Sequence, residues 1–314
     1  MMEKQKNLPA GFISEFIPCN GITLHVIHNG SAYQGSPIQD DRQPLLCLHG
    51  FPEFWISWEE VMKELGDEYF MVVPDQRGCN KSDAPQGSEN YTAKKLVADM
   101  LTLANLFFGR RKFNLAGHDF GASVAYALVF KFPELINKFI IVNGAHPIGL
   151  QEALIDDPAQ IVASQYFHTL REDGAGIKSA ANDFKTSFEV ITGHATKNWM
   201  TEEIKQRFRD AWEGAERLQA MFNWYKSSPI IVPLIGQPLP EASLYGASRN
   251  HFRVTVPHLL IWGKNDTALL PEVRKSLPEF CDDLTIKEVE NADHWILHTH
   301  AHLVASYIRK YLNE

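Results

Sequence analysis

The chain has 314 residues, of which 45% are hydrophobic, and its formal net charge is −8. This length allows one large α/β domain or two smaller ones with a substantial core. The negative charge and the lack of a Lys/Arg stripe argue against a nucleic-acid partner, and no apolar run approaches the length of a membrane span.

The cysteines and the N-terminal residues bear on the cellular compartment. The sequence contains four widely spaced cysteines and no C-x-x-C pair: Cys19, Cys47, Cys79 and Cys281. This spacing favours reduced thiols over disulfides or a zinc ribbon. The first residues lack the apolar segment of a signal peptide. We therefore expect a soluble cytoplasmic protein without a membrane partner, either a monomer or a homodimer.

Strand and helix signals alternate over the first half of the chain. Asn20-Gly21 is a strong hairpin turn signal between two β-like runs. Continuous apolar runs predict buried strands, and amphipathic runs between them predict helices: strands within 44–50, 69–78, 112–119 and 138–145, and helices from Ser57, over 92–109 and over 121–133. Ser57 and Glu60 have capping-box spacing. Such alternation predicts a mostly parallel sheet with helical crossovers.

The alternation stops between residues 147 and 250, where the sequence is mostly helical and rich in aromatic residues. Thr201 is a candidate helix N-cap, and residues 227–240 form a Pro-rich loop. The α/β pattern then returns with strands within 256–266 and 284–291, and with helices over 271–280 and 295–312. We predict an α/β core domain of residues 1–146 and 251–314, interrupted by an inserted helical cap domain of residues 147–250.

A sharp turn between a predicted strand and a helix carries the main chemical signal. Residues 117–121 read GHDFG, which has the form of the G-x-S-x-G nucleophile elbow with Asp119 in place of serine. Asp266 follows a later buried strand, and His294 follows the last strand. Nucleophile, acid and histidine thus occur in the chain order of an α/β-hydrolase triad.

The HGFP segment, residues 49–52, ends an earlier buried strand. Acyl-transfer chemistry needs backbone N–H groups directed at a developing oxyanion. The amides of Phe51 and Phe120 are suitable donors, so we expect an oxyanion hole there. We also expect substrate contacts from the following side chains: His49, Phe51, Pro52, Phe120 and Trp224.

Over nearly its whole length the chain resembles the soluble bacterial epoxide hydrolases of the α/β-hydrolase fold. The motifs that carry the resemblance are HGFPE, PDQRG, GHDFGA, NWY, WGKND and DHW. The resemblance implies that Asp119 is the nucleophile, Asp266 the charge-relay acid and His294 the general base. It also implies two cap tyrosines facing the nucleophile. Tyr225 lies in FNWYKS, which matches the family motif. Tyr166 lies in a segment where LREDG replaces the usual Phe-Gln-Glu-Pro-Gly, so the sequence leaves open whether Tyr166 donates a proton equally with Tyr225.

A carboxylate suits this position because it can attack an sp³ carbon and form a covalent ester. For an epoxide, protonated tyrosine hydroxyls would supply a proton to the departing oxygen. Water activated by His294 and Asp266 would then hydrolyse the ester of Asp119 and release a vicinal 1,2-diol. This chemistry requires no cofactor and no metal.

Two other functions use the same framework. A haloalkane or haloacid dehalogenase also has an aspartate nucleophile, but Phe120 lacks the N–H that binds halide, and neither Phe120 nor Ser123 is an arginine that would hold a substrate carboxylate. A non-catalytic ligand-binding protein of this fold is the other alternative. Such a protein would be expected to tolerate the loss of triad residues, yet all three are present in this sequence, which disfavours it. An esterase is disfavoured because the elbow has no serine.

Several histidines near the C-terminus have a simpler interpretation than a metal site. His294, His298 and His302 have i, i+4 spacing, which can suit zinc on a helix face, but there is no H-E-x-x-H motif. We interpret the additional histidines, His300 included, as a polar stretch of helix. His118 is expected to pack beneath the elbow.

Overall fold

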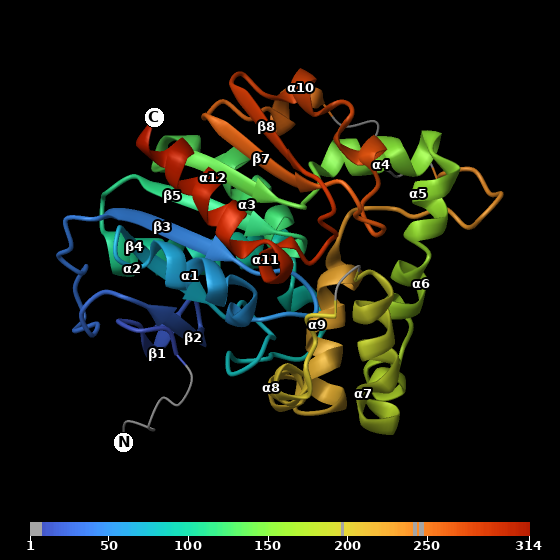
Figure 1. Cartoon of the computed structure of the whole chain (residues 1–314). Helices are drawn as coiled ribbons and strands as arrows, with labels where there is room; N and C mark the ends of the chain where they lie inside the picture. Colours follow the sequence, from blue (N-terminus) through green and yellow to red (C-terminus); the bar gives the residue numbers. More distant parts are fainter. Residues whose placement is uncertain (1–7, 196–197, 241–243, 245–247) are drawn as a thin grey trace.

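The computed structural model describes residues 8–195, 198–240, 244 and 248–314. An eight-stranded sheet with the order β1-β2-β4-β3-β5-β6-β7-β8 forms its centre (Figure 1). β1 (Ile13–Cys19) and β2 (Ile22–His28) are antiparallel to their neighbours, and the other pairs are parallel. The prediction of a mostly parallel α/β sheet is confirmed.

The N-terminal hairpin forms at the predicted turn. Asn20 and Gly21 have φ values of 49° and 79°, and Cys19 pairs with Ile22. Positive φ at both central residues is the requirement of a type I′ turn, which Asn-Gly satisfies at little cost.

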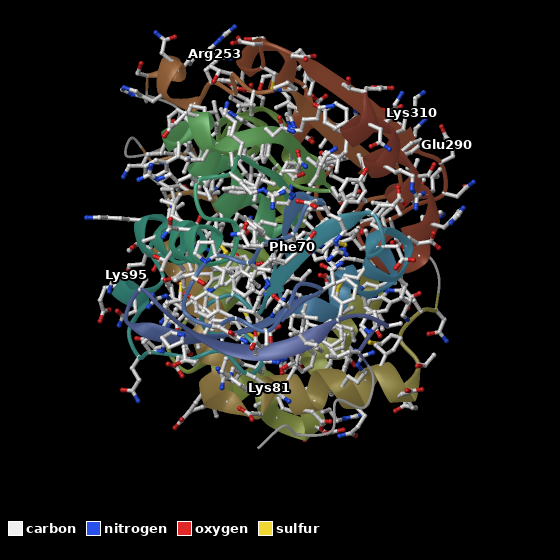
Figure 2. The ribbon with its side chains drawn as sticks, turned by 90° about the vertical axis from the view of Figure 1, so that its left-hand side faces the viewer. Phe70, Lys81, Lys95, Arg253, Glu290 and Lys310 are labelled. Carbon is white, nitrogen blue, oxygen red and sulfur yellow. The ribbon has the colours of Figure 1, made fainter. Side chains whose placement is uncertain are left out.

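The parallel strands arise from the continuous apolar runs of the sequence. They are β3 (Gln43–Leu48), β4 (Tyr69–Pro74), β5 (Phe113–His118), β6 (Ile136–Val142), β7 (His258–Gly263) and β8 (Leu284–Val289). Every residue of β4, β5 and β7 is buried, as expected for strands covered on both faces. Figure 2 shows Phe70 of β4 inside the molecule, with Arg253, Glu290 and Lys310 at its periphery.

Helices cover both faces of the sheet. On one face α1 (Glu59–Leu65) packs against α12 (Ala301–Asn313), and on the other α2 (Ala93–Phe108) packs against α3 (Phe120–Lys131) (Figure 1). Shorter helices complete the core: η1 (Trp55–Trp58), η2 (Ser88–Asn90), η3 (Pro133–Leu135), η5 (Arg249–Phe252), η6 (Pro271–Arg274), α10 (Leu277–Phe280) and α11 (Ile296–Thr299).

In the described part of the segment between β6 and β7 there are six α-helices besides η5, and we refer to residues 147–250 as the helical insertion. The helices are α4 (Pro147–Asp156), α5 (Pro158–Ala163), α6 (Tyr166–Arg171), α7 (Ala175–Gly193), α8 (Glu202–Trp212) and α9 (Ala215–Ser227). Figure 1 shows them beside the carboxyl ends of the parallel strands. The predicted helix N-cap at Thr201 is confirmed: its Oγ1 accepts a 3.3 Å hydrogen bond from the Ile204 amide at the start of α8. Residues 228–240 contain no helix or strand, as predicted.

Three helix predictions need correction. Ser57 does not begin a capped helix: it lies inside η1, its hydroxyl donates to the Phe54 carbonyl, and α1 starts at Glu59 without a side-chain cap. The predicted helix over 271–280 is divided into η6 and α10, and Pro278 lies at the start of the latter. The C-terminal helix is broken at His300, where φ is −138°.

No helix among the described residues has the length and apolarity needed to span a membrane. All four cysteines carry free thiols, and three of them are fully buried in the core.

Candidate active site

Asp119 occupies the turn between β5 and α3. Its φ of 48° and ψ of −118° place it in a region that costs an L-residue about 1–3 kcal/mol, which the surrounding packing must offset. The turn is crowded: a Cβ at Gly121 would lie 2.4 Å from the Leu48 carbonyl oxygen. Glycine is therefore required two residues after Asp119 for α3 to approach β3 so closely.

The structure brings the three predicted triad residues together. His294 Nε2 lies 3.4 Å from Asp119 Oδ2, and His294 Nδ1 lies 2.8 Å from Asp266 Oδ2. All three follow strands of the same parallel sheet, so their side chains meet at its carboxyl edge. The imidazole thus bridges two carboxylates, one of which is more accessible: the side chain of Asp119 is 15% exposed and that of Asp266 is 0% exposed.

The Asp266 carboxylate is held by further donors. Its Oδ1 accepts hydrogen bonds from the amides of Ala268 and Leu269 at 2.8 and 2.9 Å. Asn143 Nδ2 donates to Asp266 Oδ2 at 2.7 Å, and Asn143 Oδ1 accepts from the Gly263 amide. Asn143 therefore links β6 to the acid on β7.

Burial and the neighbouring charges shift the pKa values of the three predicted triad residues in opposite directions. Burial favours the neutral form of each group, but the neighbouring charges outweigh it. The His294 imidazolium lowers the pKa of Asp119 and of Asp266, with further help from the hydrogen bonds to each carboxylate. In return, these two carboxylates hold the pKa of His294 well above its usual value.

One predicted oxyanion donor contacts Asp119. The Phe51 amide donates to Asp119 Oδ1 at 2.8 Å. This approach depends on Gly50, because a Cβ there would lie 2.5 Å from Asp119 Cβ. The Phe120 amide lies at the first residue of α3, where helix N–H groups have no intrahelical partner.

Tyr166 and Tyr225 come from α6 and α9 and face each other, with ring centroids 6.0 Å apart. Burial raises the pKa of both hydroxyls, and the negative charge of Asp119 raises it further. Both tyrosines are therefore protonated at neutral pH. The Tyr225 ring also contacts the rings of Phe51 and Phe120 edge-on, at 5.0 and 5.1 Å.

The other residues expected to contact substrate divide into two groups. Trp224 lies 5.0 Å from the Phe120 ring, although its Nε1 donates to the Arg77 carbonyl. His49 is fully buried, and its ring nitrogens bond to the Gly50 carbonyl and the Gln76 amide. Pro52 is also buried, and its carbonyl accepts from Trp212 Nε1. The structure thus brings Phe51 and Phe120 to Tyr225, whereas Trp224 packs between Phe120 and the buried His49, and Pro52 bonds to Trp212.

Glu53 is a further buried carboxylate, connected to the predicted triad through His118. Glu53 Oε1 is 2.5 Å from His298 Nε2, and Glu53 Oε2 is 3.4 Å from His118 Nδ1. His118 Nε2 in turn bonds to the His294 carbonyl at 2.9 Å. Burial would raise the pKa of Glu53, but His298 and His118 lower it to about 2. The sequence assigned no role to Glu53, because only the tertiary structure brings these histidines to it.

The C-terminal histidines lie apart from one another. His298 is on α11 and His302 on α12, and the latter bonds to Glu64 at 3.2 Å. Among the described residues, no group of three His, Cys, Asp or Glu side chains is arranged to hold a metal ion.

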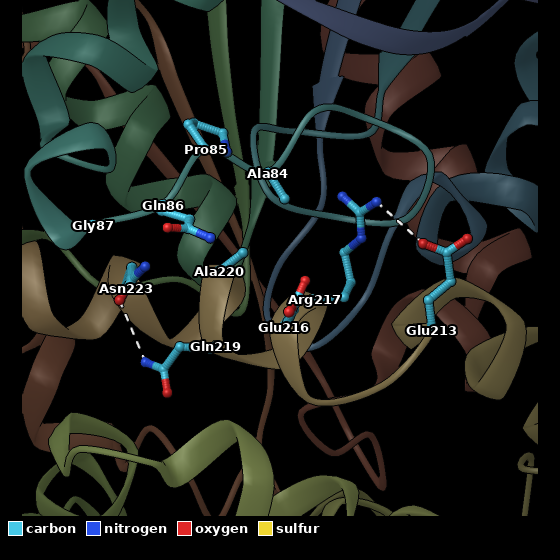
Figure 3. Close-up of a pocket in the computed structure, with 10 residues that line it drawn as sticks. All are labelled: Ala84, Pro85, Gln86, Gly87, Glu213, Glu216, Arg217, Gln219, Ala220 and Asn223. Atoms are coloured by element: carbon cyan, nitrogen blue, oxygen red, sulfur yellow. Dashed lines mark hydrogen bonds and ion pairs between the residues drawn. The ribbon is translucent and has the colours of Figure 1, made fainter.

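A pocket of about 470 Å³ lies between α9 and the loop of residues 84–87 (Figure 3). Gln219 and Asn223 line it from α9, and the Arg217 guanidinium lies beside Glu213 at its edge. Its lining residues include neither Asp119 nor Tyr225. It is therefore a surface feature separate from the triad.

Comparison with known proteins agrees with this geometry. The family described as alpha/beta hydrolase fold matches residues 43–301. The AB hydrolase superfamily protein YfhM of Bacillus subtilis is 32% identical over 96% of this chain and 98% of its own length. Human epoxide hydrolase 4 is 29% identical over 94% of this chain and 77% of its own. The inhibitor-bound crystal structure of the Bacillus megaterium epoxide hydrolase has a TM-score of 0.80 at 25% identity, covering 96% of this chain and 100% of its own. The chain belongs to the α/β-hydrolase fold family, and epoxide hydrolases are among its relatives.

Proposed function

We propose that this protein is an epoxide hydrolase that forms vicinal 1,2-diols through a covalent ester of Asp119. The observation that carries the proposal is the aspartate at the nucleophile elbow, 3.4 Å from His294 and close to two protonated tyrosines, of which Tyr225 is buried and Tyr166 partly buried. Relatives named as epoxide hydrolases match this chain over nearly its whole length. In this proposal the helical insertion is a cap domain, because it supplies both tyrosines.

The first step is attack of the Asp119 carboxylate on an epoxide carbon. The lowered pKa of Asp119 keeps it ionised at neutral pH. As the C–O bond breaks, Tyr225 and Tyr166 donate hydrogen bonds and a proton to the epoxide oxygen, and Asp119 becomes an alkyl ester. General acid catalysis of this kind contributes about 10²–10⁴-fold.

The second step is hydrolysis of that ester. Esterification removes the negative charge of Asp119, one of the two charges that raise the pKa of His294. The pKa of the imidazole therefore falls once the ester has formed. His294 gives up its proton, which restores the tyrosine hydroxyl deprotonated by ring opening, and the neutral imidazole becomes a base for water. Asp266 orients the ring through Nδ1, and the amides of Phe51 and Phe120 stabilise the oxyanion. Neither step requires a cofactor or a metal.

The substrate we propose is a hydrophobic epoxide. A cluster of apolar side chains surrounds Tyr225, and all of its buried members come from the helical insertion: Leu154, Phe167, Tyr225, Ile230 and Val232. Phe51 and Phe120 pack against it from the core. The side chains of this cluster carry no charge, which favours aryl or alkyl groups in the substrate.

Halide release by the same nucleophile is the second function to be tested. A halide ion needs N–H donors near the leaving group. Phe120 has none in its side chain, and the N–H of Trp224 is already bonded to the Arg77 carbonyl. The contacts at Asp119 therefore favour an epoxide over a haloalkane.

Diol formation from a panel of aryl and alkyl epoxides, with wild type and Asp119→Ala, tests the proposal. We expect diol from the wild type and none from the variant. His294→Gln should accumulate the ester, which intact-protein mass spectrometry detects as the wild-type mass plus one epoxide. If the wild type yields no diol, the proposal fails; halide release would then indicate a dehalogenase, and inactivity with both substrate classes would favour a ligand-binding role.

A further inference from the structure

Arg171, in the segment where this chain departs from the usual family motif, joins the two elements that carry the tyrosines. It is the last residue of α6, which begins at Tyr166. Its Nε donates to the Tyr225 carbonyl at 2.9 Å, and one terminal nitrogen donates to the Ile230 carbonyl at 2.7 Å. Arg171 therefore ties α6 both to the last turn of α9 and to the loop that follows.

The guanidinium also packs against the aromatic cluster. It lies 5.3 Å above the centre of the Phe167 ring, and that ring contacts Tyr225 edge-on at 4.8 Å. Phe167 contacts Tyr166 at 5.0 Å as well. Arg171, Phe167 and the two tyrosines thus form one packed group, in which a movement of the guanidinium changes the position of both hydroxyls.

Within the described part of the chain, no Asp or Glu forms an ion pair with Arg171. Its hydrogen-bond partners are two backbone carbonyls, of which that of Tyr225 lies at the C-terminus of α9, where a positive charge is favourable. The charge is therefore not neutralised by a carboxylate. It lowers the pKa of Tyr225, against the larger opposite effect of burial.

We propose that Arg171 is a positioning residue for ring opening, which fixes Tyr225 relative to Tyr166 and strengthens Tyr225 as a proton donor. The proposal rests on the proposed epoxide hydrolase function. A nearby positive charge stabilises the tyrosinate that forms as the proton moves to the epoxide oxygen. Arg171 has no contact with Asp119, Asp266 or His294, so ester hydrolysis does not depend on it.

Single-turnover kinetics of Arg171→Met and Arg171→Lys test this assignment. Methionine keeps much of the side-chain volume but removes the charge and both hydrogen bonds. We therefore expect the alkylation rate constant to fall at least tenfold, which corresponds to a rise of about one unit in the pKa of the donor hydroxyl. Ester hydrolysis should change less than about twofold. Lysine keeps the charge and one donor, and should restore most of the alkylation rate.

Arg217→Met is the matched control. Arg217 lies on α9, donates to the Ser82 carbonyl and pairs with Glu213 at 3.2 Å, so it also ties the insertion to its surroundings (Figure 3). It does not contact either tyrosine. We expect both rate constants to be unchanged. If Arg171→Met slowed both steps equally, or only reduced the fraction of active enzyme, Arg171 would have a general structural role and the proposal would be wrong.

A second measurement needs no substrate. In protein labelled with ¹³Cζ-tyrosine, the Tyr225 resonance at neutral pH should shift in Arg171→Met and not in Arg217→Met. An unchanged Tyr225 resonance would overturn the proposal even if the enzyme is active. Conversely, a wild type that forms no diol would refute the epoxide hydrolase function, while a shifted resonance would still support the positioning of Tyr225 by Arg171.

Discussion

The hydroxyl of Tyr225 acts in only one of the two proposed steps. Tyr225→Phe keeps the ring contacts with Phe51 and Phe120 but removes the proton donor. We expect the alkylation rate to fall by about 10²-fold, with a smaller effect on ester hydrolysis. Stopped-flow fluorescence in single-turnover mode separates the two rates. Tyr33→Phe, where the ring packs on Phe107 away from the site, is the control. Equal slowing of both phases would show that Tyr225 is not the donor.

Glu53 makes a pH-dependent contribution to stability. Its pKa is about 2 in the folded protein, below the unfolded value near 4.5. The folded state therefore binds the proton less readily, and the stabilisation is fully present above pH 4.5 and is lost as the pH falls towards 2. A difference of this size corresponds to about 3 kcal/mol.

Glu53→Gln should accordingly lower the free energy of unfolding by about 3 kcal/mol at pH 7, since it leaves the buried His118 and the partly buried His298 without their carboxylate. Urea denaturation at several pH values measures this, and the gap to wild type should narrow below pH 4.5. Glu64→Gln removes the comparable but exposed partner of His302 and should cost less than about 1 kcal/mol. A gap that stays constant down to low pH would contradict the assigned ionisation of Glu53.

At the scale of elements, the close approach of α3 to β3 sets a sharp steric limit. Gly121→Ala places a methyl group 2.4 Å from a backbone oxygen, so we expect a loss of about 2 kcal/mol or more and a displaced Asp119. Gly193→Ala is the control, because nothing lies within 4 Å of its Cβ position at the end of α7. Thermal denaturation compares the two. Equal melting temperatures would mean that the elbow can relax without cost.

The elements that the sequence predicted well are those with a strong local signal. The buried strands have continuous apolar runs, and Asn20-Gly21 and Thr201 determine local backbone geometry directly. Ser57 also has a local signal, but the η1 turn places its hydroxyl near the Phe54 carbonyl and overrides it. The break at His300 was missed because the apolar period continues across it.

The residues of the candidate site also differ in whether the sequence carries a signal for them. Strand ends, chain order and the family resemblance predicted the triad residues and the tyrosines that the structure brings together. Asn143, Glu53 and Arg171 could not be predicted, because each acts through a partner more than 50 residues away: Asp266, His298 and Tyr225. For Arg171, the unusual LREDG segment was the only sequence signal, and it gave no indication of its partner.

At the scale of the whole molecule, the thiols are protected by the core. Burial raises the pKa of Cys19 and Cys281 to about 12, and that of Cys47 and Cys79 as well. Since the thiolate is the reactive form, we expect slow reaction with Ellman's reagent at pH 8, beginning at the half-buried Cys281. In urea all four thiols should react at once. Fast reaction of two or more thiols in the native protein would contradict this burial.

The position of the helical insertion determines which part of the protein can be exchanged between relatives. The insertion leaves the core after β6 and returns at β7, and these neighbouring strands pair in register from Phe139–His258 to Val142–Ile261. Its two ends are thus anchored on adjacent strands of one rigid sheet, which also carries Asp119, Asp266 and His294. The part proposed to hold the substrate and the part proposed to hydrolyse the ester can consequently vary as separate modules. In the proposed mechanism, exchange of residues 147–250 between relatives would alter which epoxides are admitted and how their oxygen is held, while the residues that hydrolyse the ester stay in place.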